Sequence, residues 1–186
     1  MRDLSPDEEA FLKEGVSQYL PAVRALGDFV EYCTDAIRET IRPYDERLRS
    51  LGLVCSSNKS DYWPKVGAVV ESLMGVAIKV SDRSSVYLEI YFNEVEPASS
   101  MWIGTWFWPR DAQSRSDLFK LCDSHGATYG LDVKKHSDGT VYLGTYADYR
   151  ERFPQFESML NTVILNILEL FEKIGFAERF TDSLKK

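Results

Sequence analysis

The longest apolar stripe in the chain lies near its C-terminal end and predicts a helix. Apolar residues recur there at spacings of three and four, which places them on one broad face of a helix over about 154–175. Pro154 suits the first turn of this helix and Gly175 suits its end. The stripe consists of Phe156, Met159, Leu160, Val163, Ile164, Ile167, Leu168, Phe171 and Ile174. We expect this helix to be the strongest element of the core.

The N-terminal part of the chain also has the pattern of helices. Ser5 is suited to cap a helix and Pro6 to occupy its first position. Pro21 is expected to break or kink this helix, and a second helix then runs to about residue 42. Pro43 bends or interrupts the chain, and Gly52 supplies a left-handed end after further helical turns. The core-facing stripe of the second helix consists of Val23, Leu26, Val30, Cys33, Ile37 and Ile41.

The middle of the chain changes to the alternation of apolar and polar residues that is typical of strands. Residues 76–80 and 86–92 alternate on either side of a polar turn and predict a hairpin. Residues 65–80 fit either a helix or strands, and strands are preferred for their glycines and β-branched residues. A second hairpin is predicted from residues 129–133 and 141–145, which are joined by a turn that contains Asp-Gly.

Between these two hairpins the sequence predicts a strand and a short helix. Met101–Trp108 holds three of the four tryptophans of the chain and is expected to be a strand. A short helix near 114–125 then follows. Ser114 or Ser116 is expected to cap its start and Gly126 to close it.

The order of these elements predicts an α+β fold in a single domain over residues 1–186. The chain has a helical region at 1–52, mainly strands at 53–147 and a C-terminal helix at 154–175. Strands that follow one another through hairpins form an antiparallel sheet. We expect five or six strands, with the terminal helices packed on the aliphatic face of the sheet.

The tryptophan strand divides its side chains between two faces of the sheet. Met101, Ile103 and Phe107 fall on the aliphatic face, and the tryptophans fall on the other. If the strands pair as expected, Gly104 and Gly144 leave shallow gaps on that second face, which we call the aromatic face. Its candidate partner-binding residues are Tyr87, Glu89, Tyr91, Trp102, Trp106, Trp108, Tyr142 and Tyr146. This face is either a second core covered by the N-terminal helices or an exposed binding surface.

Composition restricts the classes of function. The net charge of −7 argues against a sequence-independent nucleic-acid binder, which needs a basic surface. The three cysteines are widely spaced and indicate neither a disulfide framework nor a zinc site. With no signal peptide and no apolar run long enough to span a membrane, a cytoplasmic location is expected. The sequence predicts no cofactor.

Motifs that would identify an enzyme are absent from the sequence. It contains no phosphate-binding glycine loop, no His-Glu-x-x-His and no Gly-x-Ser-x-Gly. Cys122 and His125 lie three residues apart on the expected short helix, where they could form a nucleophile and base or simply a core thiol and a helix-terminal cation. Glu71, Glu89 and Asp132 lie on expected strands and could bind a metal in a nuclease-like enzyme if they converged.

These features favour a small protein-binding module that restrains a partner protein, as an immunity factor or inhibitor does. The aromatic face would grip the partner, and Glu89 would pair with a partner's arginine or lysine. One alternative is a small-molecule-binding domain or enzyme with its pocket on this face. A metal-dependent nuclease and a homodimer that closes over its own aromatic faces are further alternatives. No membrane partner is expected.

Overall fold

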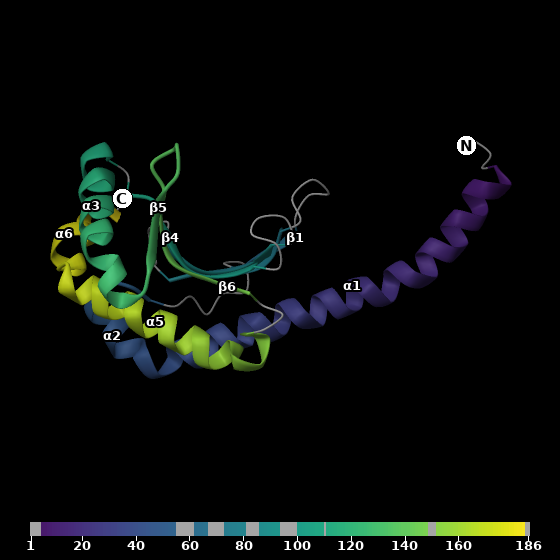
Figure 1. The fold of residues 1–186 in the computed structure, drawn as a ribbon, viewed down its shortest axis with the longest axis horizontal. Helices are drawn as coiled ribbons and strands as arrows, with labels where there is room; N and C mark the ends of the chain where they lie inside the picture. The colour runs from purple at the N-terminus through teal and green to yellow at the C-terminus, as the bar shows by residue number, and fades with distance from the viewer. Residues whose placement is uncertain are drawn as a thin grey trace.

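The computed structural model describes residues 5–54, 62–66, 73–80, 86–93, 100–109, 111–148 and 152–184. A curved sheet lies over a layer of helices (Figure 1). The helices are α1 (Pro6–Ile41), α2 (Asp45–Ser50), α3 (Ala112–Gly126), α5 (Phe156–Lys173) and α6 (Phe176–Leu184), with short 3-10 turns η1 (Arg42–Tyr44), η3 (Ala127–Tyr129) and η4 (Phe153–Gln155). The strands are β1 (Tyr62–Val66), β2 (Leu73–Lys79), β3 (Val86–Asn93), β4 (Ser100–Phe107), β5 (Asp132–Lys135) and β6 (Val141–Asp148).

Every pair of neighbouring strands in the sheet is antiparallel, and the order is β1-β2-β3-β4-β6-β5. Strands β2 and β3 form the first predicted hairpin, and β5 and β6 form the second. The second hairpin turns at Gly139, whose φ of 90° favours glycine. The predicted α+β class with an antiparallel sheet is therefore confirmed.

Helix α1 runs through Pro21 without interruption, so of the predicted break or kink the break is wrong, and the predicted second helix is the C-terminal part of α1. The φ of proline suits a helix. Its missing N–H and the clash of its ring with the carbonyl one turn earlier cost about 3 kcal/mol, which a long helix can tolerate. Pro21 lies on the exposed side of α1, which curves over this length (Figure 1). The predicted left-handed end at Gly52 is confirmed by its φ of 74°. Leu53 N–H donates to the Leu48 carbonyl at 2.8 Å across this turn, which caps α2.

The capping of α3 differs from that predicted. Its cap is Asp111, whose carboxylate accepts from the Ser114 N–H at 2.7 Å, and neither Ser114 nor Ser116 caps the helix. Gly126 is the last residue of α3, so the predicted end of the helix is confirmed, but its helical φ of −54° means that it is not a left-handed cap. The chain instead turns at Gly130, where φ is 65°. Position 126 leaves little room for a side chain, because a Cβ there would lie 2.6 Å from Val133 Cγ2.

The core lies between the sheet and the helices. The predicted stripe of α5 is buried except for Met159, which is half-buried. Helix α1 contributes Cys33, Ile37 and Ile41, while the side chains of Val23, Leu26 and Val30 lie outside the described residues. The sheet contributes the aliphatic set of the tryptophan strand, as predicted, and α6 adds Phe176 and Phe180. The buried sheet residues are Val80, Val86, Leu88, Ile90, Met101, Ile103, Phe107, Val141 and Leu143.

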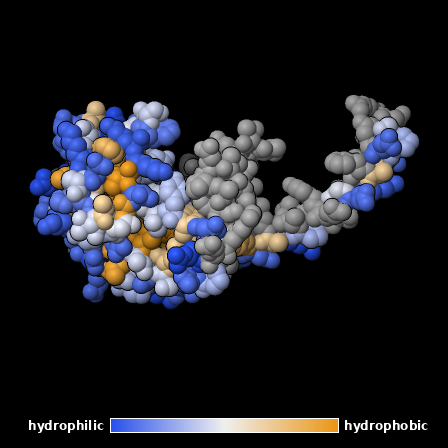
Figure 2. Space-filling view, viewed as in Figure 1, coloured by the Kyte–Doolittle hydropathy of each residue, from blue (hydrophilic) through white to orange (hydrophobic). Residues whose placement is uncertain are grey.

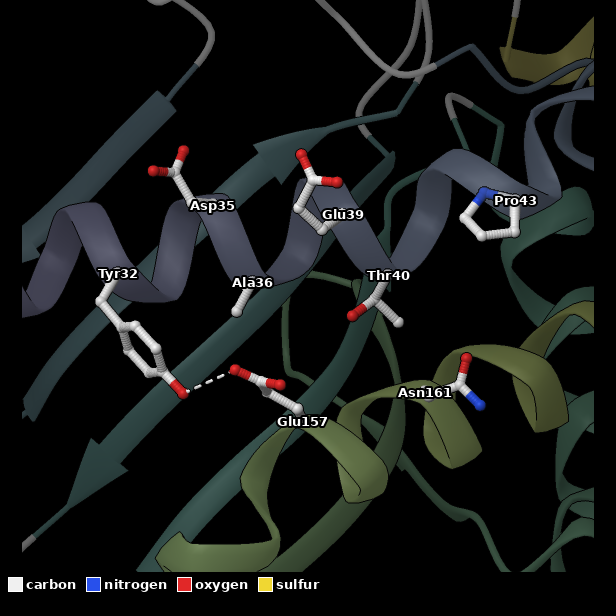
Figure 3. Close-up of a pocket in the computed structure, with 8 residues that line it drawn as sticks. All are labelled: Tyr32, Asp35, Ala36, Glu39, Thr40, Pro43, Glu157 and Asn161. Atoms are coloured by element: carbon white, nitrogen blue, oxygen red, sulfur yellow. Dashed lines mark hydrogen bonds between the residues drawn. The ribbon is translucent and has the colours of Figure 1, made fainter.

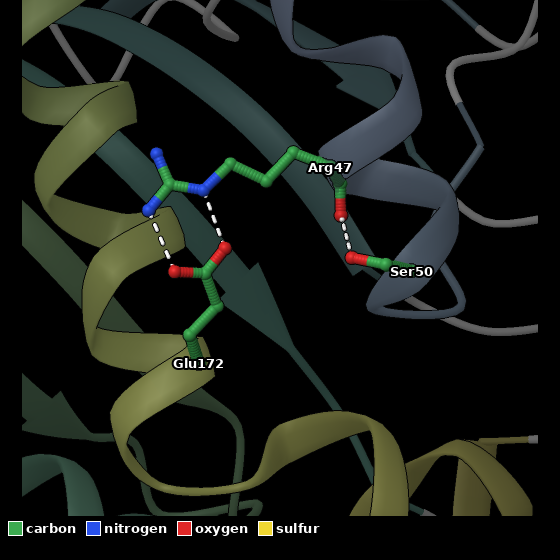
Figure 4. Close-up of polar contacts among 3 residues, drawn as sticks. All are labelled: Arg47, Ser50 and Glu172. Carbon is green, nitrogen blue, oxygen red and sulfur yellow. Dashed lines mark hydrogen bonds and ion pairs between the residues drawn. The ribbon is translucent and has the colours of Figure 1, made fainter.

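A salt bridge joins α2 to α5 within the helical layer. Arg47 of α2 donates from Nε and Nη2 to the two carboxylate oxygens of Glu172 on α5 (Figure 4). Both side chains are partly exposed, at 28% for Arg47 and 42% for Glu172. Hydrogen bonding to Arg47 lowers the pKa of Glu172 below its usual range. This contact fixes α2 against the C-terminal half of α5.

The N-terminal half of α1 extends away from the sheet as an arm (Figure 1). Most coloured residues along this arm are hydrophilic (Figure 2). Within the part of the chain that the structure describes, no helix is both long enough and apolar enough to cross a bilayer.

Candidate functional site

Strand pairing aligns the residues predicted for the aromatic face into rows across the sheet. Tyr87, Trp106 and Tyr142 are register partners in one row, on β3, β4 and β6. The next row carries no aromatic residue. The full rows are Tyr87↔Trp106↔Tyr142, Glu89↔Gly104↔Gly144 and Tyr91↔Trp102↔Tyr146. Because these residues alternate with buried core residues along each strand, they lie on the face turned away from the helical core.

The two central glycines hold the indole of Trp102. A Cβ on Gly104 would lie 2.8 Å from Trp102 Cζ2, and a Cβ on Gly144 would lie at the same distance from that atom. The space over both glycines is therefore filled by this ring, and the shallow gaps that the sequence suggested are absent here. The glycines also allow the two strands to approach, because a Cβ on Gly144 would lie 2.6 Å from Gly104 Cα.

Glu89 is buried in the middle of the aromatic face. The more accessible residues around it, Tyr87, Trp106, Tyr142 and Tyr146, form what we call the rim. The side chain of Glu89 is 2% exposed, and its Oε1 accepts a hydrogen bond from Trp102 Nε1 at 3.0 Å. A buried carboxyl group requires hydrogen-bond partners, and Trp102 supplies one here. Glu89 therefore fixes the orientation of the indole. The direct ion pair predicted between Glu89 and a partner's cation would need a carboxylate more accessible than this one.

Tyr87, Trp106 and Tyr142 make a partly accessible aromatic row. The rings of Tyr87 and Trp106 are stacked, with centroids 4.4 Å apart and planes at 11°. All three residues are half-buried. Burial raises the pKa of the Tyr142 hydroxyl, and the nearby Glu89 carboxylate acts in the same direction. Tyr142 is therefore a neutral hydrogen-bonding group at physiological pH.

Tyr146 is the most exposed aromatic ring of the three rows whose side chain is described, at 38%. The Tyr146 ring packs on Trp102, with ring centroids 4.7 Å apart. The ammonium of Lys134 lies 4.3 Å from the centroid of the Tyr146 ring. The ring is thus supported on one side by the buried indole and on another by a cation. A ring held in this way loses little freedom when it meets a partner.

Two of the predicted residues are placed differently or lie outside the description. Trp108 follows the end of β4 and is 40% exposed. Its Nε1 donates to the Asp138 carbonyl at 3.4 Å, and the Arg115 guanidinium lies 5.5 Å from its ring centroid. Trp108 is therefore bound to the β5–β6 turn and α3, and it makes no aligned pair in the rows. The backbone of Tyr91 lies in its row, and its side chain is outside the described residues.

The alternative chemical sites find little support in the geometry. Cys122 is fully buried, and burial raises its pKa to about 12, which disfavours the thiolate that a nucleophile needs. Glu89 and Asp132 stand in one row of the sheet, three strand spacings apart or about 14 Å. That separation is too large for both carboxylates to bind one ion. Among the described residues no group of three or more His, Cys, Asp or Glu side chains is placed to hold a metal, and Glu71 lies outside them.

Sequence reasoning missed a groove on the helical layer. The groove has a volume of about 450 Å³ and lies between α1 and α5 (Figure 3). Asp35 and Glu39 line it from α1 and Glu157 from α5, and the hydroxyl of Tyr32 donates to Glu157 Oε1 at 3.1 Å. The helical spacing of Asp35 and Glu39 was visible in the sequence. Its closure by α5 was not, because it depends on how two distant helices pack.

Comparisons of the chain with protein-family models, with curated proteins and with solved structures found no match.

Proposed function

We propose that the protein is a binding module that restrains a partner protein through the rim of its aromatic face. The observation that supports this proposal best is the row Tyr87–Trp106–Tyr142, half-buried across three adjacent strands, with Tyr146 exposed beside it. Tyrosine and tryptophan provide large, rigid contact areas with a polar tip, and they are enriched in the hot spots of protein interfaces.

The buried layer below the rim favours binding because it keeps the rim rigid. Trp102 is 5% exposed and is fixed by the two glycines below it and by Glu89 beside it. Tyr146 rests on this fixed ring. A rim that is already ordered before binding loses less conformational entropy in a complex, so more of the contact energy contributes to affinity.

The charge of the chain favours a basic partner. The net charge of the chain is −7, so its overall field attracts cations. Long-range attraction of a basic partner would raise the association rate, and it would weaken as salt is added. Inhibition follows if the residues that the rim covers are those the partner uses for its own activity.

The proposal is tested by site-specific crosslinking with a photoreactive phenylalanine derivative. It replaces Tyr146 on the rim or, as a matched control, Tyr32 on the helical layer. These tyrosines are exposed to similar extents, at 38% and 41%. We expect the Tyr146 variant to crosslink to one protein in native cells, and the Tyr32 variant to give no crosslink to that protein.

The crosslinked protein is then assayed alone and with the purified chain. We expect wild-type protein to inhibit its activity and Trp106→Arg to inhibit it much less, because an arginine cannot reproduce the stacked ring. Equal crosslinking from both positions, or a partner whose activity is unaffected, would reject the proposal. Stabilisation by a small molecule that protects Tyr146 from crosslinking would instead support a ligand pocket on this face.

A further inference from the structure

The apolar positions of α1 continue beyond the part of the helix that packs on the sheet. Cys33 and Ile37 are buried in the core. Going back toward the N-terminus, apolar residues keep alternating at spacings of three and four, which is the heptad pattern of a helix that pairs with another helix. These positions are Val30, Leu26, Val23, Tyr19, Val16 and Leu12. One line of positions along α1 is therefore used by the core at one end and continues along the arm at the other.

The structure surrounds the glycines of this arm with open space. Gly15 and Gly27 flank the line, and a Cβ added to either would meet no atom within 4 Å. Among the described residues of one copy, nothing therefore requires a glycine at these positions. Glycine weakens a helix relative to alanine. It is useful in a helix interior where another backbone must come close.

The arm also carries residues that weaken an isolated helix. It contains Pro21 and two glycines, all unfavourable inside a helix. Most of the stability of helices in proteins comes from packing of an apolar face, and not from intrinsic propensity. Apart from Gly15 and Phe29, which are half-buried, the residues before position 30 whose exposure is described are exposed.

The apolar line is symmetric about position 21. Reversing the helix around this position exchanges Leu12 with Val30, Val16 with Leu26, and Tyr19 with Val23. The same reversal exchanges Gly15 with Gly27. In an antiparallel pair of helices, each a position of one helix packs beside a d position of the other. The exchanged residues would be paired in this way.

We propose that the arm of α1 pairs with the arm of a second copy of this chain, antiparallel and around a twofold axis at the level of Pro21. The pairing brings Gly15 of one copy level with Gly27 of the other at both ends of the seam, so that the backbones can approach closely. It places the two sheets at opposite ends of the paired helices and leaves both aromatic faces available. The interface is isologous, the commonest arrangement of homodimers.

Charge is compatible with self-pairing despite the acidic composition. The acidic residues Glu14, Asp28 and Asp35 fall on the side of α1 farthest from the apolar line, and all three are exposed. The positions that directly flank the line carry one charged residue between 12 and 37, Lys13. Two copies can therefore meet along the line without bringing carboxylates together.

The first test is the mass of the protein in solution, measured by analytical ultracentrifugation over a range of micromolar concentrations. We expect a dimer. Val23→Glu should weaken it more than about 100-fold, because it places an unpaired charge in the seam. Ala25→Glu is the matched control on the exposed side and should leave dimerisation unchanged. A wild-type monomer, or equal behaviour of the two variants, would overturn the proposal.

The glycines provide a test that does not depend on a disruptive charge. In an isolated chain Gly15→Gln with Gly27→Gln should increase helicity, because glutamine is the better helix former and its Cβ would meet nothing within 4 Å. In the proposed dimer the same pair of changes keeps the helix and weakens association by at least about tenfold, through loss of close contact. Unchanged association with higher helicity would contradict the pairing.

The antiparallel direction is tested by spin labels attached at Asp7→Cys, in a chain whose Cys55 is replaced by serine. Cys33 and Cys122 are buried and should not be labelled. Two labels should lie about 40 Å apart in the antiparallel pair, from a rise of about 1.5 Å per residue, and near 10 Å apart in a parallel pair. A short distance would overturn the proposed arrangement.

Discussion

The close approach of β4 and β6 at their glycine pair predicts a large effect of adding a single methyl group. In Gly144→Ala the new Cβ would lie 2.3 Å from the Ile103 carbonyl oxygen and 2.6 Å from Gly104 Cα. Both atoms belong to the backbone of the neighbouring strand, so a change of side-chain rotamer cannot relieve the clash. The strands must separate, and the ring of Trp102, which lies 2.8 Å from the same Cβ, must move.

The expected loss of stability follows from this geometry. Overpacking that shifts the backbone typically destabilises a protein by about 1–3 kcal/mol. Because the new Cβ has close contacts on two sides, we expect Gly144→Ala to lose about 3 kcal/mol of stability. That is a large fraction of the roughly 5–15 kcal/mol that stabilises an ordinary protein. For a chain of 186 residues it corresponds to a decrease in Tm of about 6–12 °C.

Urea unfolding, followed by tryptophan fluorescence and by far-ultraviolet circular dichroism, measures this loss. The native emission of the variant should shift to longer wavelength, because the displaced Trp102 ring becomes more accessible to water. Gly126→Ala is the comparison. Its Cβ would lie 2.6 Å from a methyl group of the half-buried Val133 side chain and 3.1 Å from the Leu131 carbonyl oxygen, a looser backbone contact than at Gly144. Alanine also favours the helix, so we expect less than half the loss. A Gly144→Ala protein with wild-type stability and emission would refute the assigned role of the glycine pair.

Three further predictions concern buried or paired groups. Glu89→Ala should lose about 1–3 kcal/mol by leaving the buried indole N–H without its acceptor, while Glu89→Gln keeps an acceptor and should lose less in the same urea assay. Cys33 and Cys122 should not react with a thiol reagent at pH 8 until the protein unfolds. Burial raises both pKa values from 9.0 to about 12, so the thiols of the unfolded chain ionise first as the pH rises. The free energy of unfolding should therefore fall as the pH rises from 9 toward 12. Arg47→Met should lose no more than about 1 kcal/mol of stability at neutral pH. This difference from wild type should shrink in acid. The pKa of Glu172 is lower in the folded protein than in the unfolded chain, so its ion pair stabilises the fold above the unfolded-state pKa and is lost as the pH falls through the folded-state pKa.

Local periodicity was sufficient to predict the main elements from the sequence. The stripe of α5 and the two hairpins depend on residues close together in the chain, and their patterns are specific to a helix or a strand. Pro21 gave the wrong prediction because its local preference is weaker than the continuity of the surrounding helix. The start of α3 was misplaced because Asp111 and Ser114 are both good caps, and the chosen one depends on how the chain leaves β4.

Long-range properties of the aromatic face needed strand register. The alternation along β4 predicted which residues share a face, and the rows in the sheet follow from it. The filling of the glycine gaps was not predictable, because it requires Gly104 and Gly144 to be register partners and Trp102 to lie over both. The burial of Glu89 depends on the same ring. A carboxylate in the middle of an aromatic strand is otherwise equally compatible with an exposed position.

The geometry divides the aromatic face into a buried base and an accessible rim, and the division has consequences for function. Glu89, Trp102 and the glycine pair form the base, so their substitution should alter stability and binding together. Tyr146 has its ring more exposed, so its truncation should weaken binding while changing stability little. If the rim is the working surface, the base acts as its support. The carboxyl group of Glu89 then contributes to function by orienting Trp102 more than by attracting a partner. The tryptophan strand then contributes to both layers, with Trp102 in the base and Trp106 in the rim.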